Sequence, residues 1–86
     1  TMKKNKLVSA LKLPEDILYQ DITLSLCGRR KLYVENFKGI LSFQPECICI
    51  QAKDSRLYIK GKGLEIVYYT EEQLELTGWI GQILYE

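Results

Sequence analysis

The 86-residue sequence contains no histidine, the side chain most used for proton transfer near neutral pH and the commonest protein ligand of transition metals. Its three cysteines are an odd number and cannot all pair within one chain, which favours a reducing compartment. Neither sign of charge predominates, because 12 Lys and Arg face 11 Asp and Glu, and a net charge of +1 gives no long-range field to hold nucleic acid. We therefore expect no enzyme, no nucleic-acid-binding protein and no bound metal or cofactor.

Long hydrophobic runs are also missing. The apolar segment 7–11 follows a basic start but is interrupted by Lys12 and Pro14, so it is too short for an export signal. No segment reaches the roughly 18 apolar residues of a membrane-spanning helix. These absences predict a cytoplasmic protein. Hydrophobic residues make up 47% of the chain, enough for one core in one domain.

The first 20 residues differ in pattern from the rest. Apolar residues at helical spacing between Asn5 and Leu13 predict a short helix that ends before Pro14. A cap over one end of the domain is the favoured interpretation, and a basic surface helix that contacts anionic lipid is the alternative. Residues 1–20 are thus expected to form a helix and a Leu-Pro linker, followed by a single all-β domain over residues 21–86.

After Asp21 the apolar period changes to two, which is typical of half-buried strands. The alternation predicts about eight short strands, at 22–27, 31–35, 39–44, 47–52, 56–60, 64–69, 73–77 and 79–85. Their connections carry turn formers or charged pairs and are too short for a helical crossover, so the strands should be mostly antiparallel. The expected fold class is mainly β, a small barrel or sandwich, with a β-solenoid-like stack as the alternative.

The same alternation divides the side chains between two faces. The residues expected to point inward are Leu24, Leu26, Leu32, Val34, Ile48, Ile50, Leu57, Ile59, Leu64, Ile66, Leu74 and Leu76, together with Tyr68. Those expected to point outward, as a candidate protein-interaction face, are Tyr33, Tyr58, Val67 and Tyr69. The alternative is that these good strand formers are half exposed without a role. Open strand edges offer a second route, to a homo-oligomer.

Two further clusters have a chemical and a plain interpretation. Cys47 and Cys49 share a strand face and could form half of a site for a thiophilic metal, but a closed site needs four ligands, so small strand residues are the favoured interpretation. Arg29, Arg30 and Lys31 form the densest basic cluster, and residues 60–63 the next. Either could contact phosphate, yet a strand and not a helix follows each, so solvated turn charge is favoured. We keep Arg29 and Arg30 as candidate interaction residues.

The order of certain short motifs points to a known family. The first half contains Leu13-Pro14-Glu15-Asp16-Ile17, then Ile22-Thr23-Leu24 and Gly28, then the run from Leu32 to Ile40. The second half contains the run from Leu57 to Gly61, then Leu64-Glu65-Ile66, then Gly78-Trp79-Ile80 through to Tyr85. Over nearly its whole length the chain resembles the YabP/YqfC family of sporulation proteins, and its leading helix and Leu-Pro element are closer to the YqfC branch. It departs from the family pattern at Ser55 and Cys27.

This resemblance implies a role in endospore formation, in the mother cell of a Gram-positive spore former, without catalysis. Family members are encoded beside integral membrane proteins, which implies a partner of that kind at the forespore envelope. We therefore expect a protein-binding module for spore envelope assembly, cytoplasmic or peripheral at the forespore membrane, with no catalytic residue and no membrane span of its own. A small-ligand or lipid-binding β-barrel is the alternative, and it requires an unfilled interior.

Overall fold

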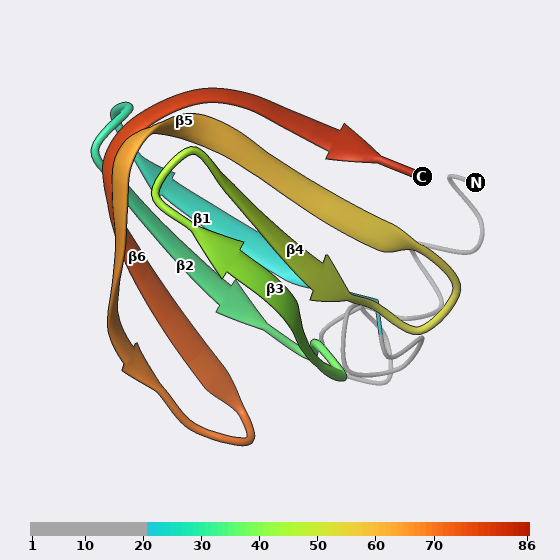
Figure 1. Ribbon diagram of the computed structural model, residues 1–86. Coiled ribbons are helices and arrows are strands. Elements are labelled where there is room, and N and C mark those ends of the chain that lie inside the picture. Colours follow the sequence, from blue (N-terminus) through green and yellow to red (C-terminus); the bar gives the residue numbers. More distant parts are fainter. Residues whose placement is uncertain (1–20) are drawn as a thin grey trace, which may run out of the picture.

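The computed structural model describes residues 21–86, which form strands and, within that range, no helix (Figure 1). The strands are β1 (Thr23–Cys27), β2 (Lys31–Glu35), β3 (Gly39–Gln44), β4 (Cys47–Gln51), β5 (Arg56–Tyr69) and β6 (Gln73–Tyr85). They form one sheet in the order β1-β2-β6-β5-β4-β3, and every neighbouring pair is antiparallel. The mainly β, antiparallel prediction is confirmed, and the stacked solenoid is excluded for this part of the chain. The helix expected within residues 1–20 lies outside the described residues.

The prediction of about eight strands is wrong, because β5 and β6 each run through a position that the sequence marks as a break. Gly61 and Gly63 lie inside β5 and Gly78 lies inside β6. Gly78 has a φ of 130°, and a Cβ there would come within 2.6 Å of the Gly63 carbonyl oxygen. These glycines allow the two long strands to approach each other closely and to bend together. Residues that are typical of a turn therefore mark a bend within continuous strands in this protein.

The bend divides the sheet into two halves that face each other. We call β1, β2 and residues 64–69 and 73–77 the first half-sheet, and β3, β4 and residues 56–60 and 80–85 the second half-sheet. The terminal strands β1 and β3 are not neighbours in the sheet, so the sheet is open and not a closed barrel.

Backbone hydrogen bonds hold the two corners of this folded sheet. At one corner the Ile80 N–H donates to the Arg29 carbonyl at 2.8 Å, and the Gly78 N–H donates to the Arg30 carbonyl at 3.2 Å. At the other corner the Leu64 N–H donates to the Pro45 carbonyl at 2.9 Å. Two short hairpin turns are thereby attached to the bent parts of β5 and β6.

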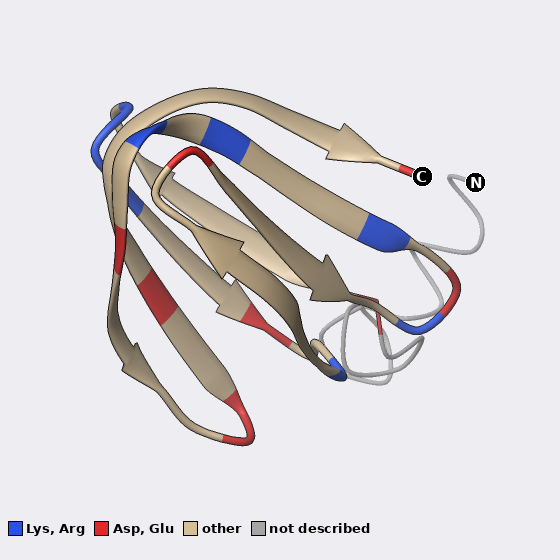
Figure 2. Ribbon diagram, viewed as in Figure 1, with Lys and Arg blue, Asp and Glu red and all other residues tan. Residues whose placement is uncertain are grey.

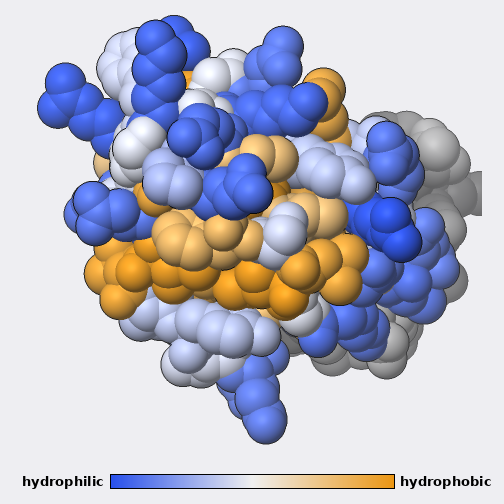
Figure 3. Space-filling view, viewed as in Figure 1, coloured by the Kyte–Doolittle hydropathy of each residue, from blue (hydrophilic) through white to orange (hydrophobic). Residues whose placement is uncertain are grey.

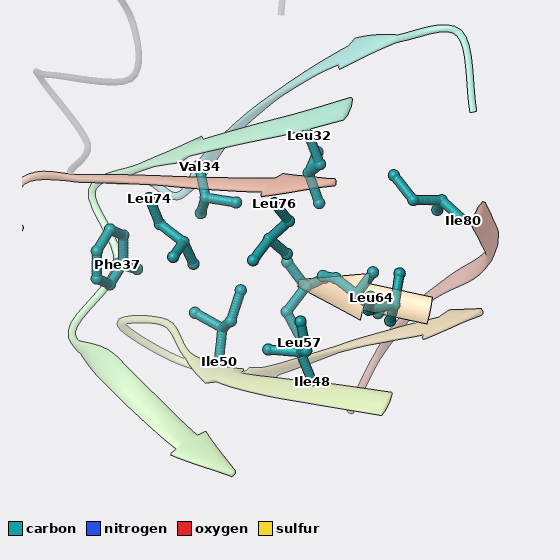
Figure 4. Close-up of a cluster of buried hydrophobic side chains, with 11 residues drawn as sticks. Leu32, Val34, Phe37, Ile48, Ile50, Leu57, Leu64, Leu74, Leu76 and Ile80 are labelled. Atoms are coloured by element: carbon teal, nitrogen blue, oxygen red, sulfur yellow. The ribbon is translucent and has the colours of Figure 1, made fainter. Parts of the chain in front are cut away.

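The core lies between the two half-sheets (Figure 4). Its buried cluster consists of Leu32, Val34, Phe37, Ile48, Ile50, Leu57, Ile59, Leu64, Leu74, Leu76 and Ile80. Nine of the twelve predicted inward aliphatic residues belong to it, and Leu24 and Ile66 pack against it partly buried. The prediction for Leu26 is wrong: it is 54% exposed, near the end of β1, which is a terminal strand of the sheet formed by residues 21–86. Each full burial of such a side chain stabilises the fold by about 1.5–3 kcal/mol.

The predicted orientations of Tyr68 and Tyr69 are reversed. The register between β5 and β6 shifts between Ile66 and Tyr68, so that Tyr68 pairs with Glu75 and Tyr69 pairs with Leu74. Directly paired residues share a face, which directs Tyr69 to the side of buried Leu74 and turns Tyr68 outward, although Tyr69 at the end of β5 is still 52% exposed. The Tyr69 ring accordingly lies 5.7 Å from the ring of buried Phe37. One extra residue in the strand resets the alternation that follows it.

Candidate docking surfaces

The six candidate interaction residues do not form one face. The outer face of the first half-sheet carries Tyr33, the outer face of the second carries Tyr58, one corner carries Arg29 and Arg30, and the end of β5 carries Val67 and Tyr69. The structure therefore separates residues that strand alternation alone groups together, because the sheet folds back on itself and its two outer faces point in different directions.

The outer face of the first half-sheet presents a row of side chains across four strands. In register these are Ser25, Tyr33, Glu75 and Tyr68, and the two tyrosines are 37% and 39% exposed. Ser25, Tyr33 and Tyr68 of this row line a surface hollow of ≈ 340 Å³ together with Val34, Glu35, Gln73 and Leu74, and Glu75 does not contribute to its lining. Glu35 and Gln73 lie on the same outer face as the row. We call the surface formed by the row together with Glu35 and Gln73 the tyrosine face. Tyr33 lies on it as predicted, whereas Tyr68 was missed because only the β5 register reveals its direction.

Hydrogen bonds connect the side chains along the rim of the tyrosine face. The Tyr68 hydroxyl donates to Gln73 Oε1 at 3.4 Å, and Gln73 Nε2 donates to Glu35 Oε2 at 3.3 Å. Two aromatic rings with polar tips thus flank the half-buried Glu75 on a strand framework. Such a surface can bury apolar area and accept or donate hydrogen bonds at once, as protein interfaces do.

Tyr58 occupies a different environment on the second half-sheet. It pairs with Cys49 on one side and Leu84 on the other, and its hydroxyl donates to Glu86 Oε1 at 3.3 Å. The Arg56 guanidinium lowers the pKa of Tyr58, but the Cys49 thiol, desolvation and the Glu86 carboxylate raise it, and the net pKa lies above its ordinary value. Tyr58 therefore acts as a neutral hydrogen-bond donor near neutral pH.

The cysteines are spread over two strands. Cys49 is buried, Cys47 is half-buried on the same strand, and Cys27 is exposed at the end of β1. Within residues 21–86 no group of three or more cysteine or acidic side chains is placed to hold a metal ion.

Val67 is the unpaired residue of the irregularity in β5, and its side chain is exposed. Figure 3 shows a band of apolar surface on one side of the molecule, over β3 and the second half of β5. These strands contribute the exposed side chains of Leu41, Phe43 and Val67, which are 51%, 46% and 54% exposed. Part of the apolar surface of these strands is thus left outside the core.

The corner at Arg29 and Arg30 brings together two basic segments that are far apart in the sequence. Arg29 donates from Nε to the Ile80 carbonyl at 3.1 Å, and its guanidinium lies 4.5 Å from the centre of the Trp79 ring. Lys62 pairs with Trp79 in the sheet and so belongs to the same corner. Lys60 lies in a strand as predicted, but β5 continues through Lys62, so the prediction of a turn at residues 61–63 is wrong. We call the five cations Arg29, Arg30, Lys31, Lys60 and Lys62, together with Trp79, the basic corner (Figure 2).

Sequence reasoning missed Trp79 as a surface residue. Its position after Gly78 is typical of the start of a strand, and nothing in the local pattern shows that an arginine from another hairpin lies over its ring. The pairing of the Arg29 backbone with Ile80 creates that contact.

The fold and its surfaces define a small, open antiparallel β-sheet protein with an aromatic outer face and a basic corner. In residues 21–86 there is no helix with the length and apolar character needed to cross a membrane. A family model described as the YabP family matches residues 19–86, and the chain belongs to this family. It is also 29% identical over 79 residues to the uncharacterized protein YqfC of Bacillus subtilis (strain 168), a match that covers 92% of this chain and 85% of that protein. The family assignment made from the sequence motifs is confirmed.

Proposed function

We propose that this chain is a non-enzymatic sporulation protein that binds another protein through its tyrosine face. Membership of the YabP family supports the sporulation setting. The resemblance adds the expected place of action, which is the cytoplasm of the mother cell, peripheral at the forespore membrane, with an integral membrane protein as the partner. In this proposal the chain contributes to the assembly of the spore envelope.

The tyrosine face is the observation that carries this proposal. Tyr33 and Tyr68 project from two strands of one sheet and lie on either side of Glu75. Tyrosine is among the residues that contribute most binding energy at protein interfaces, because a large ring is buried at a small cost in side-chain entropy. Side chains on paired strands are also held in place before the partner arrives, which lowers the ordering cost of association.

The terminal strands of the sheet support self-association as a second part of the proposal. β1 and β3 are the terminal strands, and neither contains a charged residue or a proline. Such residues usually protect an edge from pairing with another strand. The pairing of β3 with β4 is interrupted by a bulge at Leu41, whereas β1 pairs regularly with β2, so the part of β1 from Leu24 to Cys27 is the better template for a strand of a second copy.

Capture of the partner from sporulating cells tests the role of the tyrosine face. A tagged chain carrying both Tyr33→Glu and Tyr68→Glu should recover at least about tenfold less of the membrane protein partner, because two charges replace the rings that are buried on binding. Light scattering of the complex recovered with the unsubstituted chain gives its mass and hence its subunit count.

The matched control is Tyr85→Glu, which changes a tyrosine that is 63% exposed on the second half-sheet. It should leave capture unchanged. If the double variant folds, as judged by circular dichroism, and captures the partner as well as the control does, the tyrosine face is not the docking site.

A further inference from the structure

We propose that the basic corner binds the anionic headgroups of a lipid bilayer. This surface shares no residue with the tyrosine face, so the proposal goes beyond protein docking: the chain itself would touch the membrane, independently of any partner protein.

The first observation is the concentration of positive charge. Residues 21–86 hold eight of the chain's 12 basic residues, because Lys3, Lys4, Lys6 and Lys12 precede them. Five of these eight form the basic corner, at the upper left in Figure 2, whereas Glu71 and Glu72 lie at the tip of the β5–β6 hairpin, away from the corner. The charge is therefore segregated although the net charge is close to zero, and it is the local charge density that attracts an anionic surface.

The second observation is that this charge is not neutralised by contact. In the described part of the chain, none of the five cations is held in an ion pair with a carboxylate. Two carboxylate residues lie close to the corner. The Glu46 backbone carbonyl accepts a hydrogen bond from the Gly61 N–H, and Glu65 pairs with Thr77, which also pairs with Lys31. Five cations beside two carboxylates leave the corner positive.

The third observation is the exposed tryptophan among the cations. Trp79 is 46% exposed, and the Arg29 guanidinium covers part of its ring. Tryptophan is enriched at the headgroup level of membranes, where one part of the indole ring contacts apolar chains and its N–H remains in polar surroundings. The hydrogen bonds from Ile80 N–H and Arg29 Nε fix this arrangement on β6, so the corner presents charge and ring together without prior rearrangement.

The shape of the corner favours an extended surface over a small anion. The cations come from the β1–β2 turn and from the bent part of β5, on the outside of the fold where the strands turn over (Figures 1 and 2). Three surface hollows of residues 21–86 are lined by other side chains, and none of the five cations contributes to them. A free phosphate needs donors that converge on one point, whereas a bilayer can be contacted by cations that are spread over a convex surface.

Trp79 provides a local probe for the experiment, because it is the only tryptophan of the chain. The full chain is mixed with vesicles of phosphatidylcholine alone, or of phosphatidylcholine with about a third phosphatidylglycerol. We expect co-sedimentation and a blue shift of Trp79 emission with the anionic vesicles only. Both effects should weaken between about 0.1 M and about 0.5 M salt, because salt screens exposed charges.

Two double variants with the same change in net charge show where binding occurs. Arg30→Glu with Lys62→Glu alters the basic corner, and Lys38→Glu with Lys53→Glu alters exposed cations elsewhere. The corner variant should partition at least about tenfold more weakly into anionic vesicles, and the control variant less than about threefold. Arg29 is left unchanged because its side chain bonds to Ile80. Should the corner variant not fold, Lys62→Glu and Lys53→Glu alone give the same comparison.

Several results would overturn the proposal. Equal loss of binding in both double variants, or binding without a change in Trp79 emission, would assign the membrane contact to another part of the chain. A shift of Trp79 emission caused by inorganic phosphate alone would make the corner a phosphate site. A shift caused by a poly-glutamate peptide but not by vesicles would assign it to an acidic protein. Partner capture through the tyrosine face is measured separately, so the two proposals fail independently.

Discussion

At the scale of single residues, backbone proximity decides which glycines are irreplaceable. At Gly61 the backbones of β5 and β6 approach so closely that a Cβ would overlap the Trp79 carbonyl oxygen. Gly39 begins β3, has no unusual φ, and an added Cβ there would meet nothing within 4 Å. Two strand glycines of similar appearance in the sequence thus have different structural requirements.

We predict that Gly61→Ala lowers the free energy of unfolding by about 2–4 kcal/mol, because the overlap involves backbone atoms that can move only if the bend opens. Urea unfolding followed by Trp79 fluorescence measures the change. Gly39→Ala is the matched control and should stay within about 0.5 kcal/mol of the unsubstituted chain. Similar stabilities of the two variants would contradict the close approach at the bend.

At the scale of the strands, the sequence predicts which residues alternate but not where the alternation is reset. The period of two identifies most of the core, because a buried face must be apolar at every second position. The bulge at Val67 depends on how β5 pairs with β6, and no residue type in β5 indicates that a bulge is present. For the same reason Tyr33 could be placed correctly on the outer face, whereas Tyr68 and Tyr69 were exchanged.

The role of the glycines and the make-up of the basic corner also could not be predicted from the sequence alone. Glycine permits a turn, a bend or a close approach alike, so Gly61 and Gly78 could not separate two strands from one bent strand. The basic corner joins residues around position 30 with residues around positions 60 and 80, and only the pairing of the strands brings these segments together.

The Val67 bulge makes a direct prediction about two adjacent tyrosines. Tyr69→Ala should lower the free energy of unfolding by about 1–2 kcal/mol, because it removes a ring that packs against buried Phe37. Tyr68→Ala should cost less than about 0.5 kcal/mol, since that ring lies on the outer face with one long, exposed hydrogen bond. Paired urea titrations measure both. A larger loss for Tyr68→Ala would mean that the alternation continues unbroken through Val67.

At the scale of the whole molecule, the core and its backbone supports belong to one continuous stretch of chain. Among residues 21–86, every member of the buried cluster lies between Leu32 and Ile80, and the hydrogen bonds that hold both corners lie within residues 29–80. The family model begins at residue 19, close to the start of this stretch. The two half-sheets therefore bury each other's inward-facing apolar side chains.

This arrangement predicts that a chain shortened to residues 21–86 folds by itself. Its core side chains come from both half-sheets, so neither half can bury its inner face without the other, and unfolding should be one cooperative transition. Far-ultraviolet circular dichroism and Trp79 fluorescence should then report the same urea midpoint, because the first follows the strands and the second follows the corner of the fold. The midpoint should lie close to that of the full chain, and the full chain measured in parallel is the control. Two separated midpoints, or a broad transition only in the shortened chain, would show that residues 1–20 complete the core, and the domain would then have to begin before β1.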